Sequence, residues 1–158
     1  MKSTHIAIPY AKALFDIALE KNLLEEAMHD MKLILDICHS NRDFTLMLKS
    51  PVIATGKKTR IIHSLFDSRF SKMSMIYILI ILRKKRESLI PVIAHEFLEF
   101  YKEYKGILTT YLKTTSSISE DVRKKVVDVL KQQTNKEIEL IEDTDPEMIG
   151  GFILRWKD

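Results

Sequence analysis

The sequence predicts a mainly helical protein, a six-helix N-terminal bundle followed by a small α/β domain. The 158 residues include only four glycines and four prolines, which disfavours a turn-rich β architecture. As far as Lys105, apolar side chains recur mostly at spacings of three and four, the period of an α-helix. After Gly106 the chain becomes richer in Thr, Tyr and Ile with partial alternation, which is typical of strands. We therefore expect domains over residues 1–105 and 106–158.

Pro9 is expected to open the first helix, because a proline in a first turn loses no hydrogen bond. The apolar residues that follow at helical spacing are Tyr10, Ala13, Leu14, Ile17 and Ala18. Ala11 and Phe15 add apolar surface on a neighbouring face. This helix is therefore more widely apolar than a surface helix needs to be. Asn22 can cap its C-terminus or begin the next helix.

Four more helices are predicted before the sixth. The second covers about 23–37, and a short third over 44–48 ends before Pro51. Thr55 is expected to cap the fourth helix, and the fifth is predicted over 71–83.

The sixth helix is predicted to open near Ser88, with Pro91 in its first turn. Gly106 should end it, as a glycine just past a helix does. The following pattern predicts a strand over 107–115, a helix capped by Ser119, and two further strands over 137–141 and 149–156.

Charge is unevenly divided between the two predicted domains. Residues 1–105 hold 17 Lys and Arg against 12 Asp and Glu, a net +5, whereas residues 106–158 hold 8 against 10, a net −2. Neither density is that of a dedicated nucleic-acid binder. The start of the chain lacks a signal-peptide pattern, and its longest apolar run is far below the roughly 20 residues that cross a bilayer. We expect a soluble, intracellular protein.

No catalytic, cofactor-binding or metal-ligating constellation is predicted. The five histidines are scattered, and no two stand four residues apart in the way that helical metal ligands often do. The lone cysteine, Cys38, is expected to be a buried, inert thiol. Gly150-Gly151 precedes an apolar segment rather than a helix, so a bulge or a close backbone approach is expected there instead of a phosphate loop.

The basic run over 83–86 allows two interpretations. It could contact nucleic acid or anionic lipid, together with Lys57, Lys58 and Arg60. Alternatively, it is the solvated C-terminal end of the fifth helix, where cations complement the helix dipole. The second interpretation is favoured because no exposed aromatics are interleaved with the charges.

The segment over 75–82, MIYILIIL, is apolar on every side. Either the helix is enclosed by its own neighbours, or one side packs inward while another is covered by a second protein. On a helical wheel, one side carries Met75, Ile78, Leu79 and Leu82, and the other carries Met73, Ile76, Tyr77 and Ile80. The first and fifth helices together would then form a groove for an amphipathic helix of a partner. The candidate partner-binding residues are Tyr10, Ala13, Leu14, Ile17, Met73, Ile76, Tyr77 and Ile80.

Several short segments, in order and spacing, make the chain resemble the delta subunit of bacterial F-type ATP synthases, the family of the mitochondrial oligomycin-sensitivity-conferring protein. The segments are YAKALF (10–15), LKSPVI (48–53) with Lys58, Arg86 before LIP (89–91), ISE (118–120) and DPEMIGG (145–151). They are collinear over nearly the whole chain.

The resemblance implies a non-catalytic stator subunit in the peripheral stalk of a proton-translocating ATP synthase. Its six-helix domain would hold the N-terminal helix of an alpha subunit between the first and fifth helices. Its C-terminal domain would engage the C-terminal end of the b subunits, so that the catalytic head resists rotor torque. The resemblance also implies a peripheral position on the cytoplasmic side of the bacterial inner membrane, membrane association only through the complex, and no cofactor, metal or nucleic acid.

The sequence departs from the family pattern at three places. Asn135 stands where the family usually has Gly, although Asn tolerates the same left-handed turn. The fifth helix lacks the polar residue that the family often shows. The family continues past Trp156 with another strand and a short helix, so the α/β domain is expected to be incomplete. The rival hypothesis is a free-standing helical regulator that binds RNA or anionic lipid through its basic patches.

Overall fold

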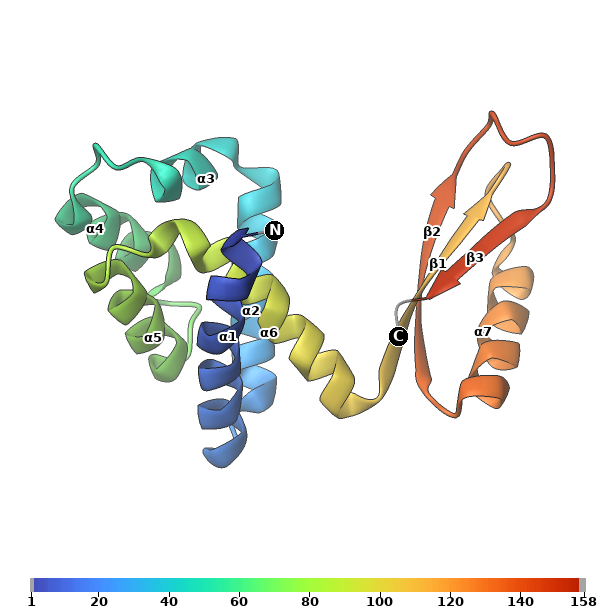
Figure 1. The fold of residues 1–158 in the computed structure, drawn as a ribbon, viewed down its shortest axis with the longest axis horizontal. Coiled ribbons are helices and arrows are strands. Elements are labelled where there is room, and N and C mark those ends of the chain that lie inside the picture. Colours follow the sequence, from blue (N-terminus) through green and yellow to red (C-terminus); the bar gives the residue numbers. More distant parts are fainter. Residues whose placement is uncertain (1, 157–158) are drawn as a thin grey trace. The chain divides into compact units, whose positions relative to one another are not determined.

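A computed structural model describes residues 2–156, and the side chains of residues 4–156. It confirms a mainly helical chain followed by a small three-stranded sheet with one helix (Figure 1). The chain divides into two compact units, Met1–Tyr101 and Lys102–Asp158. None of the helices in the described part of the chain is long and apolar enough to span a membrane.

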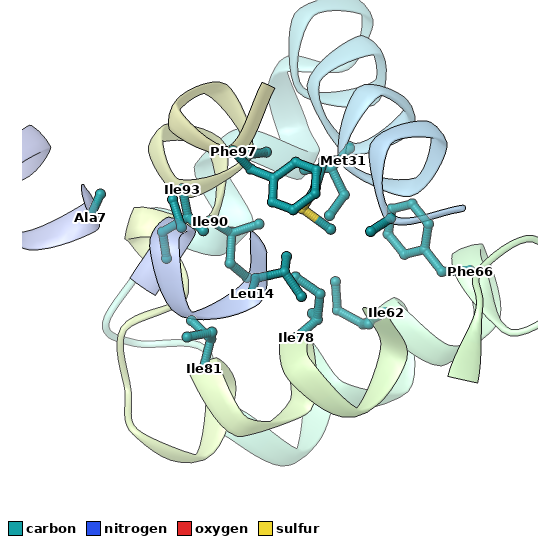
Figure 2. Packing of buried hydrophobic residues seen from close by; sticks show 14 of the residues in the cluster. Ala7, Leu14, Met31, Ile62, Phe66, Ile78, Ile81, Ile90, Ile93 and Phe97 are labelled. Atoms are coloured by element: carbon teal, nitrogen blue, oxygen red, sulfur yellow. The ribbon is translucent and has the colours of Figure 1, made fainter. Parts of the chain in front are cut away.

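Unit 1 contains six α-helices and one 3-10 turn. The elements are α1 (Lys2–Glu20), α2 (Leu24–Ser40), α3 (Arg42–Lys49), α4 (Thr55–Phe66), α5 (Lys72–Arg83), η1 (Glu87–Leu89) and α6 (Ile90–Lys105), of which the last four residues are grouped with unit 2. Twenty-one of its described residues are buried hydrophobic residues that form the core. Figure 2 shows labelled side chains of α1, α2, α4, α5 and α6 converging there, with Leu14 directed between Ile78 and Ile90.

Local chemistry explains most helix boundaries. Asn22 adopts a left-handed conformation (φ 56°) after α1, and the next amide, Leu23 N–H, donates to the carbonyl of Ala18 at 2.8 Å, which closes the helix. The side chain of Asn41 accepts a hydrogen bond from the amide of Phe44 at 3.0 Å and so caps α3. Ser71 caps α5 by accepting from the amide of Ser74 at 3.2 Å. The sequence predicts the break at Asn22 and the start of the fifth helix at residue 71.

Two predicted helix starts are wrong. Helix α1 begins at Lys2, so Pro9 lies inside it. The buried side chains of Ala7 and Ala11 flank the proline, and their packing holds the helix together where Pro9 cannot donate a backbone hydrogen bond. Thr55 is the first residue of α4 and not its cap, a position that Ala54 occupies without a side-chain hydrogen bond.

Unit 2 is built from β1 (Ile107–Thr114), α7 (Glu120–Thr134), β2 (Glu137–Thr144) and β3 (Phe152–Trp156). The strand order is β2-β1-β3, with β1 parallel to β2 and antiparallel to β3. Gly106 (φ 66°) and Asn135 (φ 53°) provide the left-handed residues before β1 and after α7. The buried leucines of this unit are Leu108, Leu112, Leu130 and Leu140.

The close backbone approach expected at Gly150-Gly151 is wrong. No atom lies within 4 Å of the point where a Cβ would stand at either residue, and both precede β3 rather than forming a bulge in it. The backbone itself requires glycine, because φ is 151° at Gly150 and 85° at Gly151. The prediction made for the chain end at Asp158 lies outside the described residues.

Candidate functional site

Helices α1 and α5 lie side by side and are tied by a hydrogen bond (Figure 1). The hydroxyl of Tyr77 on α5 donates to the backbone carbonyl of Tyr10 on α1 at 2.8 Å. Burial, reinforced by the neighbouring Tyr10, raises the pKa of Tyr77 well above its usual range. The phenol therefore stays neutral and holds the two helices in register at physiological pH.

The candidate binding residues divide into exposed and enclosed ones. Ala13, Ile17, Ile76 and Ile80 are exposed, and 58% of Ile76 is accessible to solvent. Tyr10, Met73 and Tyr77 are half-buried. Leu14 is only 1% exposed and lies in the core, so it is not available to a partner in this structure. We refer to the other seven residues as the α1–α5 surface.

The inward face of α1 differs from the predicted one. Its buried residues are Ala7, Ala11, Leu14, Phe15 and Ala18, a stripe at spacings of three and four. The sequence interpretation placed Leu14 and Ala18 with Ala13 and Ile17 on one face, because several apolar faces satisfy the same period. Packing against the rest of unit 1 decides between them.

Helix α5 shows a comparable division. Its buried side chains are Ser74, Ile78, Ile81 and Leu82, whereas Ile76 and Ile80 face solvent. At the N-terminus of α5, Ser71 bonds to Asp30 of α2. The carboxylate of Asp30 accepts from the Ser71 hydroxyl at 2.7 Å and from the Ser71 amide at 3.1 Å. These bonds fix the first turn of α5 against α2 and thereby position the exposed side of the helix.

A shallow apolar pocket of about 450 Å³ opens beside the N-terminal half of α1. It is lined by Ile6, Pro9, Tyr10, Ala13 and Arg86. Ile6 and Pro9 were missed as binding candidates because the first helix was expected to start at Pro9. Arg86 was noticed only as part of the basic run and of the family resemblance.

Arg86 is held over Tyr10 in this pocket. Its guanidinium carbon lies 5.3 Å from the centre of the Tyr10 ring, and one guanidinium nitrogen donates to the Tyr10 hydroxyl. Arg83, Lys84 and Lys85 are exposed at the end of α5. Arg86 is exposed as well, so the run has four solvated cations, one of which contacts an aromatic ring.

Lys58, one of the cations proposed for nucleic acid or lipid, is not on the surface. It is 1% exposed, pairs with the carboxylate of Glu87, and donates to the carbonyl of Leu48 at 3.2 Å. The pair joins α3, α4 and η1 inside unit 1. The basic patch of the rival hypothesis consequently loses Lys58 and consists of Lys57, Arg60 and the run after α5.

The described residues hold no cluster of three or more His, Cys, Asp or Glu side chains that could bind a metal ion. His63 Nδ1 lies 2.7 Å from the carboxylate of Asp67 on the partly exposed side of α4. Cys38 is half-buried rather than fully buried, and desolvation raises the pKa of its thiol. A raised pKa keeps this thiol protonated and poorly nucleophilic.

The family profile and the similar proteins point to the same family. The sequence profile of the family described as "ATP synthase delta (OSCP) subunit" matches residues 6–158. ATP synthase subunit delta of Cytophaga hutchinsonii is 32% identical over 158 residues, covering 100% of this chain and 86% of the relative. The chloroplastic ATP synthase subunit delta of Porphyra purpurea is 32% identical over 151 residues, covering 95% of this chain and 81% of the relative.

The fold has a counterpart among solved structures. A chain in the cryo-EM structure of the Toxoplasma gondii mitochondrial ATP synthase hexamer matches with a TM-score of 0.78 and 22% sequence identity. The match covers 93% of this chain and 83% of that one. The profile match and the relatives named above show that the chain belongs to the ATP synthase delta (OSCP) subunit family.

Proposed function

We propose that this protein is a stator subunit of the peripheral stalk of a proton-translocating F-type ATP synthase. In this role it links the alpha subunits of the catalytic head to the b-subunit stalk and resists rotor torque, without catalysing a reaction itself. The complex would hold it on the cytoplasmic side of the bacterial inner membrane. Family membership supports the role, and the uncovered apolar residues of the α1–α5 surface support the binding of a partner there.

The α1–α5 surface is the proposed binding site for the N-terminal helix of an alpha subunit. Ile17, Ile76 and Ile80 are large apolar side chains on adjacent helices that no part of unit 1 covers completely. An amphipathic helix laid across them would bury apolar surface and supply most of the binding free energy. This exposed apolar surface is the observation that carries the proposal.

Titration with a synthetic peptide of the cognate alpha N-terminus tests the site. Ala13→Asp and Ile76→Asp place a carboxylate in the apolar contact and should each weaken binding by about 2 kcal/mol or more, roughly 30-fold. Leu46→Asp is the matched control, because Leu46 is an equally exposed apolar residue on α3. Binding that survives both α1–α5 substitutions would remove this surface from the proposal.

Unit 2 is the proposed contact for the C-terminal end of the b subunits. Several apolar side chains of the unit are exposed, among them Tyr111, Phe152 and Trp156. Such side chains are typical anchors of protein interfaces. Phe152→Ser and Trp156→Ser should reduce retention of the chain on an immobilised C-terminal segment of b, while alpha-peptide binding stays unchanged.

A further inference from the structure

We infer that Arg86 is a charge-recognition residue, which pairs with a carboxylate on the amphipathic helix that occupies the α1–α5 surface. The inference rests on the proposed function and deepens it, because it assigns a polar contact to an otherwise apolar site. The position of the arginine carries it. Among the described residues, Arg86 is the one with a charge that lines the pocket formed by Ile6, Pro9, Tyr10 and Ala13.

The guanidinium of Arg86 is oriented before any partner arrives. The cation–π contact with Tyr10 and the bond to the Tyr10 hydroxyl restrict a side chain that would otherwise lose much rotamer freedom on binding. The backbone of Tyr10 is tied to α5, since its carbonyl accepts from the hydroxyl of Tyr77. Tyr10 therefore contacts both Tyr77, through its backbone, and Arg86, through its side chain.

Arg86 has further hydrogen-bond donors that could bind a partner. A guanidinium carries five N–H groups, and one nitrogen is engaged by Tyr10. Among residues 2–156 the structure gives Arg86 no ion pair with a carboxylate, and the same holds for Arg83, Lys84 and Lys85. Four cations without a paired anion make this end of the surface positive, which is complementary to a helix that carries Asp or Glu there.

Arginine suits this role better than lysine. Its planar fork presents two parallel N–H groups to a carboxylate while one face of the plane rests on an aromatic ring. Arg86 is exposed, so the pair would lie at the rim of the apolar contact. The carboxylate would therefore set the register of the bound helix, whereas the apolar residues provide its affinity.

The test uses the full chain and the synthetic alpha N-terminal peptide, with dissociation constants measured by calorimetry at low and high salt. Arg86→Gln should weaken binding about tenfold or more, the loss expected for a charge-assisted hydrogen bond. Arg83→Gln removes the same charge from a neighbouring exposed cation and should change affinity less than threefold, roughly the effect of a rim charge. Circular dichroism verifies that each variant is folded.

Peptides in which each Asp or Glu is replaced in turn by its amide complete a double-mutant cycle. One of these peptides should bind wild type and Arg86→Gln equally, which identifies the paired carboxylate. If Arg86→Gln weakens every peptide by the same factor, Arg86 only holds Tyr10 and the inference fails. If Arg86→Gln and Arg83→Gln have equal effects, the contribution is general electrostatics and the inference fails as well.

Two further outcomes separate this inference from the proposed function. Loss of peptide binding in Ile76→Asp but not in Arg86→Gln would keep the binding surface and overturn the carboxylate pairing. Absence of peptide binding to the wild-type chain, together with salt-sensitive binding to phosphatidylserine vesicles or RNA, would overturn both and favour the rival hypothesis.

Discussion

At the scale of single residues, the largest departure from the sequence interpretation concerns Lys58. A lysine beside Lys57 and Arg60 resembles part of a basic surface patch, yet its ammonium group is enclosed with Glu87 and the carbonyl of Leu48. Nothing in the local pattern distinguishes it, because its partner carboxylate is 29 residues away. The same limitation placed Leu14 on the binding face. Whether such a side chain is buried depends on its contacts with other elements, which the periodicity of a single helix does not reveal.

The buried pair gives a strong prediction for stability. Lys58→Met should lower the free energy of unfolding by about 3–5 kcal/mol, because it leaves the carboxylate of Glu87 buried without a cation. Urea denaturation measures the change. Lys57→Met, at an exposed neighbouring position, should stay within about 0.5 kcal/mol of wild type.

The double variant Lys58→Met with Glu87→Leu should recover part of that loss, because it leaves neither charge alone. Additive effects of the two substitutions would contradict a direct pairing. The second carboxylate oxygen of Glu87 has no hydrogen-bond partner, which makes this site costly even in the native protein.

Tyr77 predicts a dependence on alkaline pH. The pKa of Tyr77 is raised in the folded state, so folding favours the neutral phenol. The contribution of Tyr77 to the free energy of unfolding is therefore fully present below the ordinary tyrosine pKa of about 10, and it is lost as pH rises above that value. Tyr77→Phe should cost about 1 kcal/mol at pH 7. The difference between wild type and Tyr77→Phe should shrink above pH 10.

Thermal denaturation across this pH range provides the measurement. Tyr111→Phe is the control variant, since it removes a tyrosine hydroxyl at an exposed position on β1. A gap between wild type and Tyr77→Phe that stays constant to high pH would show that the hydroxyl does not titrate in the expected way.

At the scale of elements, the end of α5 carries an unusual feature. Lys85 has a φ of 54°, and the amide of the following residue, Arg86, donates to the carbonyl of Ile81 at 3.1 Å. This is a helix-terminating turn of the kind in which glycine is the favoured residue. In a lysine, the left-handed conformation costs free energy because the Cβ atom is sterically crowded.

Lys85→Gly should therefore raise the free energy of unfolding by about 0.5–1 kcal/mol, as measured by urea denaturation. Lys84→Gly is the matched control, because Lys84 has a φ of −80° and gains nothing from glycine. It should be neutral or slightly destabilising. Equal effects of the two substitutions would show that the strain at Lys85 is not released by removing its Cβ.

Much of the element order could be predicted from the sequence, and the errors have specific causes. Asn22, Asn41, Ser71, Gly106, Ser119 and Asn135 mark helix ends through chemistry that is local. Pro9 misled because tertiary packing of Ala7 and Ala11 outweighs the cost of an internal proline. Arg86 could not be recognised as a pocket residue, since Tyr10 lies 76 positions earlier in the chain.

At the scale of the whole molecule, the two units differ in the size of their cores. The core cluster of unit 1 contains 21 buried hydrophobic residues, whereas the buried hydrophobic residues described in unit 2 are four leucines. The three strands are covered by a single helix, α7, within the described chain. Unit 2 should consequently be the less stable of the two.

Hydrogen exchange measures this difference directly. After correction for intrinsic rates, the slowest amides of β1 and β2 should exchange at least about tenfold faster than the slowest amides of α2, which corresponds to roughly 1.4 kcal/mol in opening free energy. Matching rates in both units would indicate a single cooperative unfolding. Binding of a b-subunit segment to unit 2 should slow its exchange without affecting α2.

The strand order of unit 2 also determines how its sheet would respond to tension. Ile107 pairs with Glu137 and Thr114 with Thr144 along the parallel β1–β2 ladder, so pulling Ile107 against Thr144 loads all eight pairs at once, in shear. In the antiparallel β1–β3 ladder, Thr110 pairs with Trp156 near the end at which β1 begins. Pulling Ile107 against Trp156 would instead open that ladder one pair at a time. Force that enters the sheet at Ile107 is therefore resisted best when it leaves near the C-terminal end of β2.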